Sequence, residues 1–265
     1  MPIVDMHAHV YPDKIAQKAT ISVGQFYNLT MEAHEGSVGN LVALRDETPI
    51  THTVVCSVAV KPATVTSIND FIASSCAADD TLLGLAAMHQ DFEDPEAEIE
   101  RAVGLGLRGV KLHPDTQQVN MDDPRLMRVY EICERRNLPL LIHCGDYRYD
   151  FSHPRRLQRI LHEFPQLTIC AAHFGGWSVF DLALEFLESE RCFLDMSSSM
   201  RFLGLRRTRE LIEDYGPRRM MFGSDFPMWN PADELEQLQA MGFSAADREM
   251  MCWRNAERWL GTDIG

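Results

Sequence analysis

The apolar positions of the chain form short β-type runs that alternate with stretches of helical periodicity. Most of these runs carry a histidine or an aspartate near their carboxyl end. The eight runs cover residues 2–9, 52–60, 82–89, 108–114, 138–145, 167–176, 192–199 and 220–227. After the first gap they begin roughly 25 to 31 residues apart, which is the length of one strand–loop–helix–loop unit.

The segments between the runs predict helices. Residues 94–106, 123–137, 153–165 and 206–217 have apolar residues at three-to-four spacing, as a helix with one buried face requires. Eight strands alternating with helices, without a break in composition, predict an α/β fold in which residues 1–265 form a single (β/α)8 TIM-barrel domain. An open, doubly wound sheet is the alternative, and it would leave the eight evenly spaced units without closure.

One connection is much longer than the others. Residues from about 11 to 53 separate the first two runs, and we expect them to form a long, lid-like loop, because long connections in compact barrels often serve as lids or binding loops. Within this segment, Phe26 and Tyr27 are candidates to cap a binding pocket. The alternative is that the two rings dock the loop onto the barrel.

Composition and charge narrow the classes of partner. The 265 residues carry a formal net charge of −14 at pH 7, which argues against nucleic acid or an anionic membrane surface as the main partner. No stretch approaches the roughly 20 apolar residues needed to span a bilayer. No charged-then-apolar leader precedes the first run, and the seven cysteines form no C-x-x-C pair. We therefore expect a cytoplasmic protein with reduced thiols.

The carboxyl ends of the runs carry residue types that bind metal ions. His7 and His9 share one face of the first expected strand, because side chains two residues apart in a strand point the same way. By the same alternation, each of the other polar side chains shares a strand face with a residue before it. These sets are Lys111 and His113 with Gly109, His143 with Leu141, His173 with Ala171, and Asp225 with Gly223. Since catalytic groups of a β/α barrel lie at the carboxyl ends of its strands, we expect these side chains to face one central point.

This set of side chains suits a particular chemistry. Imidazole nitrogens with one carboxylate favour zinc or a similar first-row cation such as manganese or iron. Such a metal lowers the pKa of a bound water to about 7, and a carboxylate beside it can accept the proton of the water and return it to a leaving group. The alternative is that each histidine is simply a hydrogen-bonded core residue. This explanation would have to apply separately at several strand ends.

The segments "DMHAH", "KLHP", "LIHCG", "AHFGG" and "FGSDFP", in this order, resemble the amidohydrolase superfamily over nearly the whole chain. The resemblance is to its family-two branch, which includes aminocarboxymuconate semialdehyde decarboxylase, resorcylate-type decarboxylases and pyrone dicarboxylate lactonase. It implies that His7, His9, His143 and Asp225 hold one metal ion. It also implies that Asp225 shuttles the proton and that His173 polarises the substrate or a water.

Four further residues are candidates around that centre. Lys111 stands where binuclear members of the superfamily carry a carboxylated lysine between two metals, and we favour instead a lysine that contacts the substrate. His113 either lines the pocket or has a local role. Arg148, in the loop after residues 138–145, offers a planar fork that suits a substrate carboxylate, and Tyr27 is the candidate contact from the lid.

Three functions follow from these expectations. The first is hydrolysis of a C–N or C–O bond, in an amide, lactone or ester of a small carboxylated metabolite, by hydroxide formed on the metal, with the metal and His173 stabilising the oxyanion. The second is non-oxidative decarboxylation on the same metal site. The third, of another class, is a barrel that binds a metabolite or a partner without catalysis. The resemblance makes a homodimer a reasonable assembly.

Overall fold

The eight apolar runs form the parallel strands of a closed barrel in the computed structural model, which describes residues 2–31, 35–188 and 190–264. The strands are β1 (Val4–His9), β2 (His52–Cys56), β3 (Leu82–Gly84), β4 (Ala86–Ala87), β5 (Val110–Leu112), β6 (Leu140–Ile142), β7 (Ile169–Ala171), β8 (Phe193–Asp195) and β9 (Met220–Met221). β3 and β4 are two parts of one barrel strand. Leu85 lies between them, and its N–H donates to the carbonyl of Val55 on β2.

The barrel closes where its last strand meets its first. The N–H of Met6 in β1 donates to the carbonyl of Phe222, and the N–H of Asp225 donates to the carbonyl of His7. Ala8 and Phe226 form a parallel bridge at the same seam. These bonds complete the (β/α)8 TIM barrel that the alternation of strands and helices predicts.

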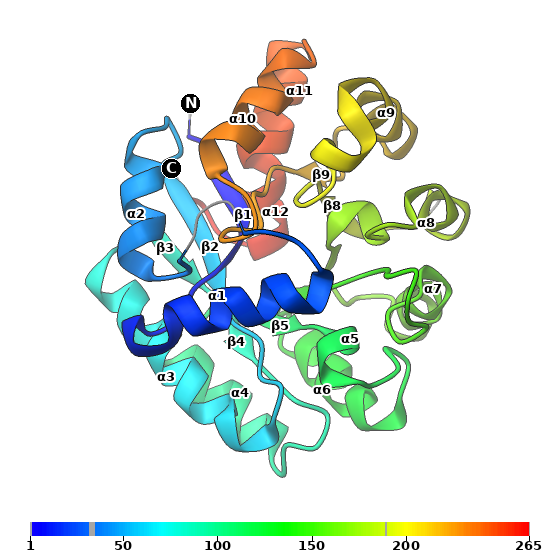
Figure 1. The fold of residues 1–265 in the computed structure, drawn as a ribbon. Coiled ribbons are helices and arrows are strands. Elements are labelled where there is room, and N and C mark those ends of the chain that lie inside the picture. Colours follow the sequence, from blue (N-terminus) through cyan, green and yellow to red (C-terminus); the bar gives the residue numbers. More distant parts are fainter. Residues whose placement is uncertain (1, 32–34, 189, 265) are drawn as a thin grey trace.

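Helices surround the barrel in a ring (Figure 1). The helices are α3 (Val65–Ala78), α4 (Pro95–Gly104), α5 (Pro114–Gln117), α6 (Pro124–Arg135), α7 (Pro154–Glu163), α8 (Phe180–Leu187), α9 (Met200–Tyr215), α10 (Pro231–Ala240), α11 (Ala245–Glu249) and α12 (Asn255–Leu260), with short turns η1 (Pro62–Thr64), η2 (His173–Gly175) and η3 (Met250–Arg254). Several begin with proline after a capping side chain, as at Asp123, which accepts the N–H of Arg125. Both features favour helix initiation at these positions.

The segment expected to be a lid-like loop is largely helical, which corrects the expectation for residues 11–53. It contains α1 (Asp13–Tyr27) and α2 (Val38–Asp46), while residues 32–34 lie outside the described part of the chain. α1 begins after Pro12 and ends at Tyr27, because the next residue, Asn28, is left-handed with φ of 54°. Figure 1 shows α1 lying across the barrel, apart from the outer ring.

Side chains of the strands alternate between an outer and an inner hydrophobic layer. In β6, Leu140 and Ile142 belong to the layer packed against the helices, whereas Leu141 belongs to the layer inside the barrel. Trp259 of α12 belongs to the inner layer, and Asn255 of the same helix donates to the carbonyls of Pro217 and Met220. α12 therefore closes the barrel where the strands begin, which leaves the opposite end for the polar residues. Within the described residues, no helix has the length and apolar character to cross a membrane.

Candidate metal centre

Three predicted ligands converge at the carboxyl end of the barrel. The Nε2 atoms of His7 and His9 lie 3.1 Å apart. Oδ1 of Asp225 lies 3.6 Å from Nε2 of His7 and 3.5 Å from Nε2 of His9. Ligand atoms bound tetrahedrally to one cation, at bond lengths of about 2.1 Å, are separated by about 3.4 Å. The spacing of these three atoms therefore fits a single first-row cation.

The seam of the barrel brings these residues together. His7 and His9 come from β1, and Asp225 follows β9 in a left-handed conformation with φ of 60°. Its N–H donates to the carbonyl of His7 over 2.7 Å, so the two residues are fixed by their backbones as well. Ser198, which also has a positive φ of 51°, donates its hydroxyl to Oδ2 of Asp225. Oδ1 is thereby left to face the two imidazoles.

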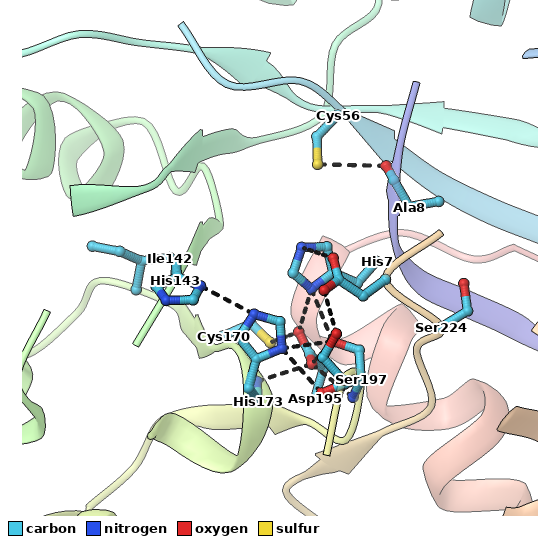
Figure 2. A network of polar contacts seen from close by, with 12 residues as sticks. His7, Ala8, Cys56, Ile142, His143, Cys170, His173, Asp195, Ser197 and Ser224 are labelled. Carbon is cyan, nitrogen blue, oxygen red and sulfur yellow. Dashed lines mark hydrogen bonds and ion pairs between the residues drawn. The ribbon is translucent and has the colours of Figure 1, made fainter. Parts of the chain in front are cut away.

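His143 and His173 form a second pair of converging nitrogens (Figure 2). Nδ1 of His143 lies 3.1 Å from Nε2 of His173. The opposite nitrogen of His143 faces the carbonyl of Gly145 at 3.0 Å and Asp115 Oδ2 at 3.2 Å, and that of His173 faces the carbonyl of Ser197 at 3.0 Å. Because carbonyl and carboxylate oxygens only accept hydrogen bonds, these outer nitrogens carry the protons. The inner pair therefore presents two facing lone pairs.

His7 also carries its ring proton on the nitrogen that points away from the centre. Its Nδ1 lies 3.0 Å from Oδ2 of Asp195, so that nitrogen carries the proton and Nε2 presents a lone pair to the centre. The facing lone pairs of His143 and His173, 3.1 Å apart, repel each other and favour a cation bound between them. Protonation is a poor source of that charge, because burial lowers the pKa of His7 to about 4 and that of His173 to about 3. The donor set therefore fits a divalent metal ion better than it fits imidazolium.

The side chain of Lys111 reaches this centre from inside the barrel. It is almost fully buried, and its Nζ lies 2.8 Å from Nε2 of His7. The neighbouring residues of β5, Val110 and Leu112, pack in the outer layer, which agrees with the inward phase expected for Lys111. The lysine is within reach of any group bound between the histidines.

A buried carboxylate, that of Asp195, underlies the histidines. Asp195, at the end of β8, is fully buried and accepts hydrogen bonds from His7 Nδ1, the N–H of His173 and the N–H of Ser197. Burial alone would raise its pKa, but the proximity and hydrogen bond of His7 hold the pKa well below its ordinary value. Asp195 is therefore a charged acceptor at the base of the centre.

Asp115 is a buried acid that sequence reasoning missed. It lies in α5, accepts the hydroxyl of Ser152, and faces Nε2 of His143. Its place two residues after His113, in "LHPD", is the one sign in the sequence that it sits near the strand end. Acids that bond histidine ligands of a metal orient the rings and fix which nitrogen is protonated.

Tyr27 connects the helix across the barrel to the polar centre. Its hydroxyl lies 2.8 Å from Nε2 of His113. The ring of His113 stacks on that of His143, with centroids 3.9 Å apart and planes at 7°. The Tyr27 ring also contacts Trp177 edge-on, at 5.0 Å between centroids. Both sequence candidates, Tyr27 and His113, therefore lie next to the proposed ligands.

Arg148 is engaged with protein groups. Its Nε and one terminal nitrogen bond Asp146, and the other terminal nitrogen donates to the carbonyl of Phe26 in α1. The guanidinium also lies over the rings of Phe26 and Tyr27, at 4.9 and 5.4 Å from their centroids. In this arrangement Arg148 fastens the loop after β6 to the end of α1.

The loops after β6 and β7 approach closely at two glycines. Gly145 has φ of 77°, and a Cβ at this position would lie 2.5 Å from the backbone of Gly176. A side chain is excluded there by both the backbone conformation and the contact. This contact holds the loop that follows His143 against the loop that follows His173, and so fixes the distance between the two strand ends.

Comparison with known proteins identifies the family. The amidohydrolase family model matches residues 4–262. The chain belongs to the amidohydrolase family. The five quoted segments of the sequence all lie within the matched residues, as do the histidines and aspartates of the centre.

Solved structures similar to this amidohydrolase share its fold. A TIM-barrel protein from Bordetella bronchiseptica is 19% identical with a TM-score of 0.77, covering 98% of this chain and 99% of that one. A Pseudomonas putida protein assigned as a 2-pyrone-4,6-dicarboxylic acid hydrolase is 20% identical, with a TM-score of 0.73 and coverage of 100% and 99%. The 5-carboxyvanillate decarboxylase from Novosphingobium aromaticivorans is 18% identical, with a TM-score of 0.77 and coverage of 98% and 96%.

Proposed function

We propose that this amidohydrolase is a metal-dependent hydrolase that cleaves a C–N or C–O bond in an amide, lactone or ester of a small carboxylated metabolite. The observation that carries the proposal is the convergence of His7 Nε2, His9 Nε2 and Asp225 Oδ1 within 3.6 Å of one another. We assign His7, His9, His143 and Asp225 as the ligands of one divalent ion. Nδ1 is the nitrogen of His143 that suits this role, because its Nε2 faces a carbonyl and a carboxylate.

Zinc is the metal that we propose, with manganese or iron as alternatives. Three imidazoles and one carboxylate suit all three ions. The similar 5-carboxyvanillate decarboxylase was solved as a complex with manganese, so the assignment needs direct measurement. When bound, such an ion polarises a substrate oxygen and lowers the pKa of a coordinated water to about 7.

Asp225 is the proposed proton carrier. Its Oδ2 accepts the Ser198 hydroxyl, and its Oδ1 points toward the two histidines of β1. In this orientation Oδ1 can accept a proton from an attacking water and return it to the leaving nitrogen or oxygen. Burial raises the pKa of Asp225 above its ordinary value, which strengthens the carboxylate as a base.

We propose a more specific role for His173 than the one expected from the sequence. Its Nδ1–H is committed to the carbonyl of Ser197, so its Nε2 accepts hydrogen bonds in the neutral form. Burial lowers the pKa of His173 to about 3, which disfavours the protonated form. We therefore assign His173 to orienting a water or a substrate hydroxyl by accepting its hydrogen bond, in place of the oxyanion contact expected from the sequence.

The substrate would lie between the centre and α1. We propose that Tyr27 and His113 line this space and that Lys111 contacts the substrate, without a second metal. Arg148 is the proposed partner of the substrate carboxylate. That contact would have to replace or share its present bonds to Asp146 and Phe26.

Decarboxylation is the second candidate, because the amidohydrolase family supports both chemistries and 5-carboxyvanillate decarboxylase resembles this chain as closely as the hydrolase does. A non-catalytic barrel is not adopted, since buried donors converge on one point. We keep a cytoplasmic location and a homodimer as proposals. The seven free thiols suit a reducing compartment.

The deciding experiment is an assay of the metal-loaded protein against lactones, amides, esters and aromatic or dienoic acids, with product analysis and detection of CO₂. Hydrolysis products without CO₂ support the proposal. Release of CO₂ without uptake of water would replace it with the decarboxylase. Elemental analysis of the purified protein accompanies the assay, and less than about half an equivalent of zinc, manganese or iron would contradict a resident metal.

A further inference from the structure

Asp195 is placed to act on two of the central histidines at once. Its Oδ2 lies 3.0 Å from Nδ1 of His7. Its Oδ1 accepts the N–H of His173 at 3.1 Å, the N–H of Ser197 at 3.0 Å and the hydroxyl of Ser197 at 2.5 Å. Figure 2 shows this carboxylate below the ring of His7 and beside the ring of His173, with Ser197 next to it.

The hydrogen bonds around Asp195 have only one consistent direction. Ser197 gives its single hydroxyl proton to Asp195, so its Oγ can only accept from Nδ1 of His7 at 3.1 Å and from Nδ1 of His173 at 3.0 Å. The carbonyl of Ser197 also accepts from Nδ1 of His173. Both histidines must therefore carry their protons on Nδ1, and both Nε2 lone pairs point toward the centre.

We propose that Asp195 is the positioning residue that keeps His7 protonated on Nδ1, so that its Nε2 is available to a divalent ion. The inference rests on the proposed metal-dependent function for its consequence, but the protonation state of His7 is a property of the chain itself. Residues that bond metal-ligating histidines in this way typically change metal affinity by about 10- to 100-fold when replaced.

Asparagine at this position tests the idea because its orientation is determined by the surrounding backbone. The Oδ1 position receives two backbone N–H groups, from His173 and Ser197. An amide NH₂ placed there would oppose both donors, so the asparagine oxygen must occupy that position. Its NH₂ group then faces Nδ1 of His7, which becomes an acceptor and moves the ring proton to Nε2.

The experiment reads the ring protons of His7 by ¹⁵N NMR of histidine-labelled full-length protein, zinc-loaded and after chelation. The His7 resonances are identified by their absence in His7→Gln. We expect the proton on Nδ1 in both states of the wild type. In chelated Asp195→Asn we expect the proton on Nε2, together with a zinc dissociation constant raised about 10- to 100-fold in competition with a chromogenic chelator.

Asp5→Asn is the matched control. Asp5, in β1, is also a fully buried carboxylate that accepts two backbone N–H groups, but its hydrogen bonds come from Ser224 and from the backbone of His7 and not from the His7 ring. We expect this variant to keep the His7 proton on Nδ1 and its zinc affinity within about threefold of wild type.

Several outcomes would overturn the inference. A folded Asp195→Asn with wild-type zinc affinity would do so, as would a wild-type His7 that carries its proton on Nε2 after chelation. The second reading needs no variant, so it remains decisive if Asp195→Asn fails to fold. If the wild type binds no divalent metal while His7 is protonated on Nδ1, the proposed function fails and the positioning role of Asp195 stands.

Discussion

The hydroxyl of Tyr27 lies 2.8 Å from Nε2 of His113, although the two residues come from a helix across the barrel and from the end of a strand within it. The His113 ring in turn stacks on His143 at 3.9 Å. The last residue of α1 is thus one ring removed from a proposed metal ligand. Any change that releases α1 should therefore alter the positions of His113 and His143 at the centre.

Replacing Tyr27 with phenylalanine removes the hydroxyl and keeps the ring. We expect the free energy of unfolding to fall by about 1 kcal/mol, since one partly buried hydrogen bond is lost, and amide hydrogen exchange to increase along α1. Urea unfolding and hydrogen-exchange mass spectrometry measure the two effects. Tyr147→Phe, at a largely exposed tyrosine, should change neither quantity, and unchanged exchange in α1 of Tyr27→Phe would contradict the connection.

Replacing Asp225 with asparagine removes the proposed proton carrier and preserves the shape of the side chain. We expect turnover of the best substrate found in the assay panel to fall by about 10²- to 10⁴-fold, with an unchanged circular dichroism spectrum. The rate is measured at saturating metal, so that weaker binding of the ion is not mistaken for lost catalysis. A variant that retains the wild-type rate would remove Asp225 from the mechanism.

The metal-free protein should lose stability as the pH falls from about 6.5 to about 4. Burial lowers the pKa of His7 to about 4 and that of His173 to about 3, from 6.5 in an exposed histidine. Between these values the unfolded chain binds protons that the native protein does not, so unfolding becomes more favourable at lower pH. Urea midpoints measured in chelator should be lower at pH 5 than at pH 7.

Asp5 supplies a control of opposite sign for this pH dependence. Burial raises its pKa to about 7, from 3.8, so below pH 7 the native protein binds a proton that the unfolded chain releases, and this contribution stabilises the native state on acidification. Asp5→Asn removes the opposing contribution, and its stability should fall more steeply between pH 7 and pH 5. Equal midpoints at the two pH values in Asp5→Asn would contradict the assignment to histidines.

The metal stoichiometry should be one ion per chain. Lys111 Nζ lies 2.8 Å from Nε2 of His7, and we expect it to remain an amine. Anomalous scattering from crystals grown with zinc or manganese should give one peak between His7, His9 and Asp225, and intact-protein mass spectrometry should show no added CO₂. Two peaks on either side of the Lys111 side chain would establish a carboxylated, bridging lysine.

Arg148 permits a test that separates substrate binding from fastening of α1. Arg148→Met keeps an apolar side chain over Phe26 and Tyr27 but removes the charge. If the guanidinium binds a substrate carboxylate, KM should rise at least about tenfold for the carboxylated substrate and much less for its methyl ester. Arg155→Met, a half-exposed arginine on the next helix, should leave both KM values unchanged. Equal effects of Arg148→Met on acid and ester would limit Arg148 to fastening α1.

Regular backbone explains which parts of the centre could be predicted from the sequence. Strand alternation places Lys111 inward between two outward neighbours, and it does the same for His143 after the inward Leu141. Strand alternation fails for His173, because it predicts that His173 shares a face with Ala171. Ala171 packs in the outer layer, Ala172 in the inner one, and His173 reaches the centre through a left-handed turn with φ of 58° after β7 has ended.

The remaining features depend on contacts that a sequence pattern does not carry. A buried aspartate looks the same in the sequence whether it bonds a backbone or an imidazole, so the imidazole partners of Asp115 and Asp195 are evident only in the structure. The helix α1 is a different case. Its buried positions Ala16, Thr20 and Gly24 are spaced at four residues, which is a helical pattern, but they are small or polar and give little hydrophobic contrast.

The seam between β1 and β9 also has a consequence for biosynthesis. Asp225, whose N–H donates to the carbonyl of His7, is synthesised more than two hundred residues after it. Until that late segment has emerged and paired with β1, a nascent chain lacks one of the proposed metal ligands. Binding of an ion by all of the proposed ligands therefore requires synthesis at least as far as Asp225, and a product truncated before this residue should be unable to sequester the ion.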